Sequence, residues 1–237
     1  MKKEFILTID TETAPIDNTK KVNGNNALVY DLGVAVSDRN GKIYETLNLV
    51  IDDIMFGEYK RMRTSYYANK LPQYYVEMGT GVREIVSFAK AREMVNALME
   101  KYNIKKVAAY NTMFDYYALK KTNSYLHKEY KFFSDDVEYI DIMKMAKTVF
   151  KNNKRFLKFI EKHNLYNDYG NPKISAENVY RYIKKDVDFT EKHTGLKDVE
   201  IETEIMGYLN NRKVKLNRGI QFSYWKPLTQ KIGYWLF

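Results

Sequence analysis

The chain has 237 residues, no cysteine and a formal net charge of +9, with 45% hydrophobic and 29% charged residues. This length suits one globular domain with a sizeable core, and the lack of cysteine excludes a disulfide framework and any thiolate metal site. No apolar run approaches the length of a membrane span or a signal peptide, so we expect a cytoplasmic protein that does not enter a membrane. The positive charge favours a polyanionic partner such as nucleic acid, although a need for solubility would explain it equally well.

The first part of the chain predicts three strands. Large apolar residues alternate over residues 4–10 and run into a carboxylate, and residues 27–37 are rich in Leu and Val. The segment Asp38-Arg39-Asn40-Gly41 predicts a hairpin turn, because Asn-Gly favours positive φ. Residues 42–51 then form the third strand, antiparallel to the second.

Residues 52–82 interrupt this pattern with four breakers, Gly57, Pro72, Gly79 and Gly81, so we expect short helices and loops. Basic side chains alternate there with tyrosines, which suits single-stranded nucleic acid because rings stack on bases while cations follow phosphates. A packed insertion whose tyrosines cover the core would have the same composition, and both interpretations stay open. The residues concerned are Lys60, Arg61, Arg63 and Lys70 with Tyr59, Tyr66, Tyr67, Tyr74 and Tyr75.

The rest of the chain predicts helices and two further strands. Ser87 can cap a helix that runs to about residue 102, and Ser175 can cap one that runs to about residue 184. Strands are expected at 107–110 and 137–142, and helices at 111–121, 143–151, 154–163 and 196–211. This order predicts an α/β fold with a mixed sheet. We expect residues 1–211 to form the main domain, with an insertion at about 52–82, and the basic, aromatic residues 212–237 to pack on it as an extension.

Four carboxylates occupy informative positions in these elements. Asp10 and Glu12 are two residues apart at a strand end, and a period of two puts both on one face. Asp115 lies near a helix start, and Asp198 lies on the apolar stripe of the last helix, where an unpaired charge is costly. Exposed strand-end acids and a helix-dipole partner are the ordinary explanations for the first three. If the fold brings all four together, they repel one another unless divalent cations lie among them.

One histidine stands out from the three in the chain. His193 lies five residues before Asp198, at or before the start of the last helix, where a loop position would let it reach a site as a general base. His127 and His163 lie in lysine-rich segments and are expected to be exposed.

These segments resemble the three sequence motifs of the DEDDh 3′–5′ exonucleases, the superfamily of the epsilon proofreading subunit of bacterial DNA polymerase III (DnaQ-like) and of oligoribonuclease. Ile9-Asp10-Thr11-Glu12-Thr13 is similar to the first motif, Asn111 with Phe114-Asp115 to the second, and residues 193–198 to the third. A histidine in place of a tyrosine is typical of the h branch. Tyr30-Asp31-Leu32-Gly33 is similar to the family's second strand, and the Tyr-rich insertion and small size resemble phage-encoded members.

The sequence departs from the family pattern at three points, none of which removes a ligand or the base. Ala14-Pro15 replaces the usual Thr-Gly, Tyr110 replaces a frequent histidine, and Gly195 stands where alanine is common.

The resemblance implies a ribonuclease H-like fold with a five-stranded mixed sheet whose first three strands are antiparallel. It also implies that Asp10, Glu12, Asp115 and Asp198 hold two divalent cations, Mg²⁺ or Mn²⁺, and that His193 is the general base. Thr11, Thr13, Asn111 and Phe114 would seat the terminal nucleotide. Sites with two metals cleave phosphodiester bonds by activating a water and stabilising the leaving oxygen.

The function that the resemblance implies is hydrolysis of single-stranded nucleic acid from its 3′ end to nucleoside 5′-monophosphates. DNA is favoured as the substrate over RNA, and the expected roles are DNA proofreading or phage DNA metabolism, with a DNA polymerase or replication protein as partner. A phage-encoded chain would act in the cytoplasm of the host cell. Two alternatives stay open: a nucleic-acid-binding or polymerase-associated module without catalysis, and an exoribonuclease acting on short RNA.

Overall fold

A central mixed sheet organises the protein, whose computed structural model describes residues 3–16, 24–65, 68–127 and 129–212. In this part of the chain the sheet has six strands in the order β4-β3-β2-β1-β5-β6. β1 to β3 are antiparallel, as predicted, whereas β4, β5 and β6 each run parallel to an inner neighbour. The bounds are β1 (Phe5–Pro15), β2 (Ala27–Asp38), β3 (Ile43–Ile51), β4 (Glu84–Val86), β5 (Lys106–Ala109) and β6 (Glu138–Asp141).

The sheet corrects the sequence-based prediction in two places. The predicted count of five strands is wrong, because β4 adds a sixth at the edge beside β3. β4 has only three residues, too few for a visible period of two, and Ile85 in its middle is exposed. β1 also continues past the predicted end at Asp10 to Pro15, with a bulge between Glu12 and Thr13, so Asp10 and Glu12 lie inside a strand.

The helices follow the predicted order. Residues 52–82 contain short elements, α1 (Asp52–Met55), α2 (Tyr59–Met62), the 3₁₀ turn η2 (Ala68–Lys70) and α3 (Leu71–Gly79). Ser87 and Ser175 cap α4 and α8 by accepting hydrogen bonds from the backbone N–H groups of Lys90 and Asn178, which confirms both predicted caps. The remaining elements are η1 (Gly24–Asn26), α4 (Phe88–Lys101), α5 (Thr112–Tyr125), α6 (Ile142–Phe150), α7 (Lys154–Lys162), α8 (Ala176–Lys184) and α9 (Gly195–Asn211).

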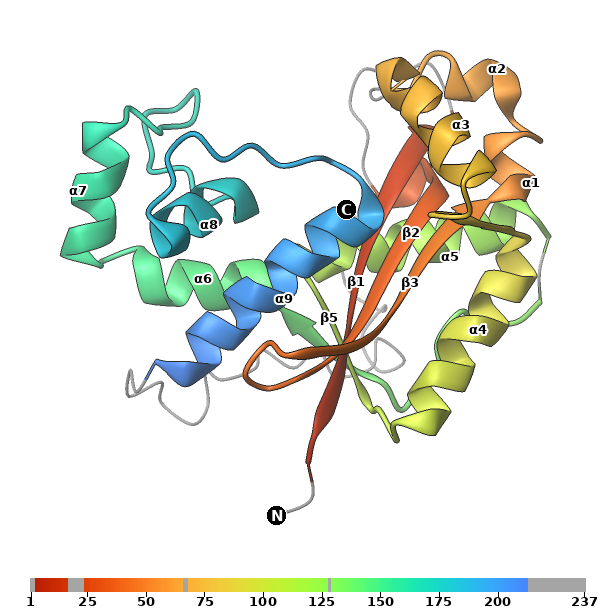
Figure 1. Ribbon diagram of the computed structural model, residues 1–237, viewed down its shortest axis with the longest axis horizontal. Helices are drawn as coiled ribbons and strands as arrows, with labels where there is room; N and C mark the ends of the chain where they lie inside the picture. Colours follow the sequence, from red (N-terminus) through yellow and green to blue (C-terminus); the bar gives the residue numbers. More distant parts are fainter. Residues whose placement is uncertain (1–2, 17–23, 66–67, 128, 213–237) are drawn as a thin grey trace, which may run out of the picture.

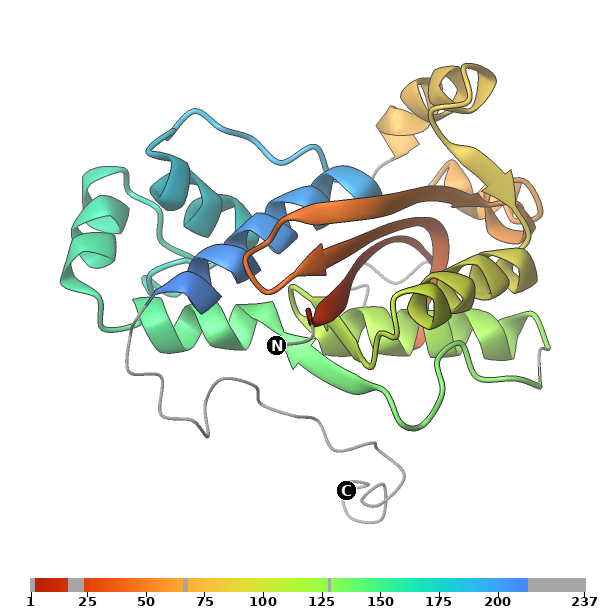
Figure 2. The same ribbon diagram turned by 60° about the horizontal axis from the view of Figure 1, so that its bottom comes forward.

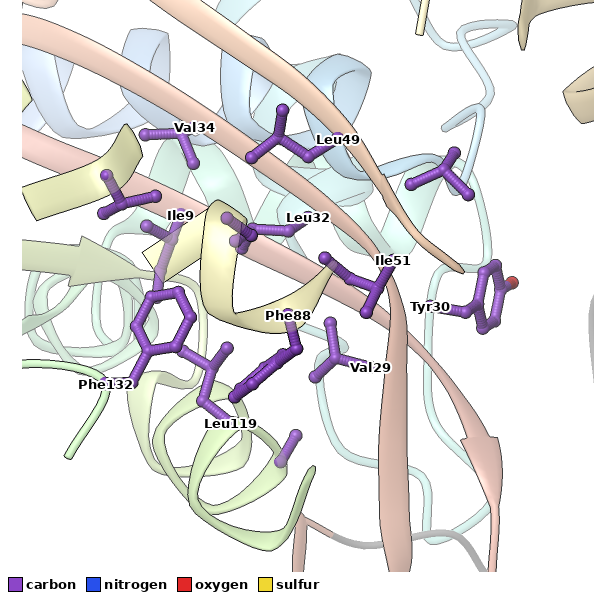
Figure 3. Packing of buried hydrophobic residues seen from close by; sticks show 14 of the residues in the cluster. Ile9, Val29, Tyr30, Leu32, Val34, Leu49, Ile51, Phe88, Leu119 and Phe132 are labelled. Atoms are coloured by element: carbon purple, nitrogen blue, oxygen red, sulfur yellow. The ribbon is translucent and has the colours of Figure 1, made fainter. Parts of the chain in front are cut away.

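Helices cover both faces of the sheet (Figures 1 and 2). Leu7 and Ile9 of β1 pack in the same cluster as Phe88 of α4 and Leu119 of α5, as Figure 3 shows for Ile9. Ile6 belongs to the second cluster, with residues of α6 and α9. Because side chains alternate along a strand, Asp10 shares the α9 face with Ile6.

Two glycine contacts bring α9 close to β2. A Cβ on Gly195, in the first turn of α9, would lie 2.5 Å from the backbone N of Gly33 in β2. Alanine therefore does not fit at position 195 without a shift of the helix, which explains why this chain has glycine there. Gly41 has φ +82° in the predicted Asn-Gly turn, and that turn packs against Gly207 near the other end of α9.

Among the described helices, none is both long and apolar enough to cross a membrane. The predicted extension at 212–237 lies, apart from Arg212, outside the described residues.

Candidate active site

Three of the four predicted carboxylates meet at one point. Asp10 and Glu12 project from β1, and Asp198 projects from the first turn of α9. One carboxylate oxygen from each lies within 4.8 Å of the others. Asp10 is half-buried, and Glu12 and Asp198 are both 7% exposed. The cluster forms because the α9 face of β1 meets the helix that Gly33 and Gly195 allow to approach.

The fourth carboxylate, Asp115, lies beside this cluster in the first turn of α5. Its Oδ1 accepts hydrogen bonds from the backbone N of Thr11 (3.1 Å) and from the Thr11 hydroxyl (2.8 Å). Thr11 therefore orients Asp115, a function that the sequence alone does not reveal. The charge of Asp115 contributes to the raised pKa of Asp10, so the two carboxylates interact.

The carboxylates destabilise one another in the metal-free protein. Burial, followed by repulsion from neighbouring carboxylates including Glu202 and Asp115, holds the pKa of Asp10 well above its usual range. Burial also raises the pKa of Asp115 and of Asp198 to about 7. Lys70 partly offsets the repulsion at Asp198 and Glu12. Without a further cation, this pocket favours protonated carboxyl groups at neutral pH.

The donor set fits a hard divalent cation. All the converging side chains offer carboxylate oxygens, which Mg²⁺ and Mn²⁺ prefer. Oδ1 of Asp198 is buried and has no hydrogen-bond partner among the described residues, and an orphaned buried carboxylate oxygen is expensive. A metal ligated by this oxygen would supply the missing partner.

His193 lies at the rim of the cluster, in the loop before α9, as predicted. Its Nδ1 is 3.9 Å from Oδ2 of Asp198 and 3.9 Å from Oε2 of Glu191, and its side chain is 40% exposed. Burial, and then the nearby positive charge of Lys70, lowers the pKa of the imidazole. A lowered pKa keeps the ring neutral near pH 7, the form that can accept a proton.

Lys70, in the Tyr-rich insertion, secures the histidine loop. Its ammonium group donates hydrogen bonds to the backbone carbonyls of Lys192 and His193, the latter at 3.1 Å. His193 has the left-handed backbone conformation, φ 49°, which a non-glycine residue keeps only when its surroundings hold it. The sequence places Lys70 among the basic residues of the insertion, and in the structure it contacts this loop.

A fifth carboxylate adjoins the site and was not predicted. Glu202 lies one turn after Asp198 on α9, is 4% exposed, and accepts a hydrogen bond from the backbone N of Tyr110 (3.0 Å). Burial and then repulsion from Asp115 hold its pKa well above the usual range. The sequence already indicated this residue, because Glu202 lies four residues after Asp198 and therefore on the same face of the helix.

A buried ionic network ties the insertion to the start of α9. Asp31 of β2 is fully buried, and its carboxylate accepts hydrogen bonds from Gly195 N (2.9 Å) and from the Tyr74 hydroxyl (2.5 Å). Arg83 places Nη1 2.8 Å from Asp31 and Nε 2.5 Å from Glu77. One carboxylate thus joins β2, the insertion and the backbone two residues after His193.

The other predicted side chains have more ordinary surroundings. Asn111 is exposed, has left-handed φ of 79° before α5, and makes no capping hydrogen bond through its side chain. Thr13 and Phe114 are half-buried, and Phe114 packs against the core. His127 is exposed as predicted, but the same prediction for His163 is wrong: this ring is half-buried against Phe159, 4.8 Å between centroids.

The insertion contains both buried and exposed tyrosines. Tyr74 is 1% exposed and packs against Tyr30, whereas Tyr59 and Tyr75 are 50% and 42% exposed. Lys60 and Arg63 are exposed as well, and Tyr66 and Tyr67 lie outside the described residues.

Solved structures share this fold at low sequence identity. The nuclease domain of 3'hExo, described as a DEDDh family member bound to rAMP, aligns with TM-score 0.60 and 13% identity over 94% of this chain and 96% of that one. A 3′-exonuclease that recognises the histone mRNA stem-loop aligns with TM-score 0.61 and 12% identity over 94% of this chain and 67% of that one. The zinc-bound E. coli ExoI–ssDNA complex aligns with TM-score 0.50 and 12% identity, over 90% of this chain but 42% of that chain. No protein-family model matches the sequence, and no curated protein matches it.

The chain therefore has the ribonuclease H-like α/β fold, as predicted. The similar solved structures include 3′-exonucleases, one of them described as a DEDDh family member, and exonuclease I, so the resemblance seen in the motifs is confirmed at the level of the fold.

Proposed function

We propose that this protein is a metal-dependent 3′–5′ exonuclease of the DEDDh type, which hydrolyses single-stranded nucleic acid to nucleoside 5′-monophosphates. The observation that carries the proposal is the meeting of Asp10, Glu12 and Asp198 within 4.8 Å, with His193 Nδ1 3.9 Å from Asp198. These residues come from two motifs near opposite ends of the chain, and they lie together in the structure. The fold shared with DEDDh exonucleases supports the same conclusion independently.

The chain's own residues have distinct roles in this proposal. Asp10, Glu12 and Asp198 would bind the metal directly, and Asp115, oriented by Thr11, would complete the set beside Asp10. Bound Mg²⁺ or Mn²⁺ supplies an activated water and charge stabilisation at the leaving oxygen. His193 accepts the proton of the attacking water, and its lowered pKa keeps it ready to do so at neutral pH.

The substrate of the proposed enzyme is a separate question from its metal chemistry. We propose a single-stranded 3′ end, with DNA favoured, seated by Thr13, Asn111 and the Phe114 ring. The His193 side chain beside the cluster is 40% exposed, which supports approach of a substrate from this side. Among the similar structures, one 3′-exonuclease recognises an mRNA stem-loop and one ExoI structure contains single-stranded DNA. The assay therefore includes both DNA and RNA substrates. A role in proofreading or phage DNA metabolism, beside a DNA polymerase, rests on the sequence resemblance alone.

The test is release of mononucleotides from matched DNA and RNA oligomers labelled at the 3′ end, with Mg²⁺, with Mn²⁺ and with EDTA. We expect metal-dependent release from the 3′ end that is lost in Asp10→Asn. Glu200→Gln is the matched control, since this partly exposed acid on α9 pairs with Lys197 away from the cluster. Tight binding without cleavage under either metal would reject the enzyme and favour a binding module.

A further inference from the structure

A second pocket lies away from the acidic cluster, between α7, α8 and the C-terminal end of α9. Its volume is about 650 Å³, within the range of small-molecule sites. Arginine, lysine and histidine side chains lie beside aromatic rings around it, and among the described residues no aspartate or glutamate lines it. This composition is the opposite of that in the candidate active site.

Three cations at this pocket have no acidic partner in the part of the chain that the structure describes. Arg155, Lys162 and Lys185 line it and are exposed, and none of them forms an ion pair with another described residue. Some exposed lysines elsewhere do form ion pairs, as Lys105 does with Asp136. Uncompensated cations around a concavity create a positive potential that attracts anions.

The aromatic side chains at the pocket are held in place. The Phe159 and Tyr182 rings meet edge to face with centroids 5.5 Å apart, and both residues are half-buried. The Arg212 guanidinium lies 4.8 Å from the centroid of the Tyr208 ring. Fixed rings beside cations are the combination that binds single strands, because bases stack on the rings while phosphates meet the charges.

The pocket is separate from the acidic cluster. Tyr208 lies ten residues after Asp198 on the same helix, which corresponds to about 15 Å at 1.5 Å per residue. At about 3.4 Å per stacked nucleotide this distance spans roughly four nucleotides. A 3′-terminal dinucleotide in the acidic cluster would not reach the pocket, even with its strand extended.

We propose that this pocket is a second nucleotide-binding site, which takes a phosphate on Arg155, Lys162 and Lys185 and a base against its rings. The nucleotide comes either from a longer strand or from a free nucleoside monophosphate. The proposal concerns binding alone and does not depend on cleavage at the acidic cluster.

The test measures binding in EDTA, where no cleavage occurs, by fluorescence anisotropy with a labelled single-stranded 12-mer. The pocket variant is Arg155→Ser/Lys162→Ser/Lys185→Asn, with Asn chosen because position 185 has φ 59°. The control variant, Lys90→Ser/Lys101→Ser/Lys105→Ser, removes the same charge from exposed positions in and after α4, which both ribbon views place far from α7 (Figures 1 and 2).

We expect the pocket variant to bind the 12-mer at least about ten-fold more weakly, and its salt slope to fall by about 0.7, the value for one neutralised phosphate of a single strand. The control variant should change affinity less than two-fold. Phe159→Leu keeps an apolar side chain but removes the ring face, and should weaken binding by at least about five-fold. Equal losses in the pocket and control variants would overturn the proposal, as would unchanged affinity in the pocket variant.

Two further measurements identify which kind of nucleotide the pocket binds and distinguish this proposal from the exonuclease proposal. Competition by a free nucleoside monophosphate that is lost in the pocket variant assigns the site to free nucleotides. Binding of the 12-mer without such competition assigns it to longer strands. Cleavage of a dinucleotide with Mg²⁺ should be the same in the wild type and the pocket variant. If no strand is cleaved but the pocket variant still loses affinity, the exonuclease proposal fails and the pocket proposal stands.

Discussion

Replacing Asp198 with asparagine should make the metal-free protein more stable while abolishing its activity. Asp198 is 7% exposed, its Oδ1 lacks a hydrogen-bond partner among the described residues, and its pKa is raised to about 7. At pH 8 the folded protein must hold this group ionised in unfavourable surroundings. Asparagine removes the charge at nearly constant shape, and its amide can donate to Asp10 or Glu12.

The magnitude follows from the pKa. The rise from 3.8 to about 7 corresponds to about 4 kcal/mol, at 1.36 kcal/mol for each pH unit. We expect the free energy of unfolding at pH 8 in EDTA to rise by about 1–4 kcal/mol, because the buried amide must still find acceptors. A gain of 1 kcal/mol raises Tm by about 2–4 °C in a domain of this size. Activity should fall at least about 10²–10³-fold, as when a comparable electrostatic contact is lost.

The assays are urea denaturation in EDTA at pH 8 and mononucleotide release with Mg²⁺. Glu200→Gln serves as the control on the same helix. It should leave both the free energy of unfolding and the rate of mononucleotide release nearly unchanged, because Glu200 forms only a partly exposed pair with Lys197. An Asp198→Asn protein that is less stable than the wild type in EDTA, or that retains activity, would refute this reasoning.

Three other changes test separate parts of the site. His193→Gln should lower kcat about 10²–10⁴-fold with Mg²⁺ affinity unchanged in calorimetry, and an equal loss of Mg²⁺ affinity would make it a metal ligand instead of the base. Asp31→Asn should lower the free energy of unfolding by about 3–5 kcal/mol in urea titrations, because Arg83 would stay buried beside a neutral amide; a loss no larger than that of Glu77→Gln, at the more exposed side of Arg83, would contradict this. The gain in Tm on adding Mg²⁺ should increase from pH 5 to pH 8. Asp115 and Asp198 have folded pKa values of about 7, above the usual 3.8, so metal-free stability falls as pH rises through this window while metal binding strengthens. A gain that does not vary with pH would show that these groups do not bind the metal.

Local signals were enough to predict most elements of the fold. The Asn-Gly turn predicted the hairpin, and Ser87 and Ser175 predicted two helix starts, because each acts through its own neighbours. β4 was not predictable, since its pairing with β3 is set by contacts distant in sequence. The end of β1 was misplaced for a related reason: its last residues pair with β2, which no local pattern reveals.

The candidate site was predicted from motif order, but its supporting contacts were not. Asp10, Glu12 and Asp198 meet as that order implies. The hydrogen bonds from Thr11 to Asp115, and from Lys70 to the His193 carbonyl, join residues far apart in the chain. Only the three-dimensional structure shows which polar side chains are buried together.

The most direct measurement is an anomalous difference map from crystals of the full chain soaked in Mn²⁺. The account predicts strong density at coordination distance from the carboxylate oxygens of Asp10, Glu12 and Asp198, with the His193 ring nearby and not ligated. Strong density only at other sites, with these three carboxylates unoccupied at saturating Mn²⁺, would contradict it.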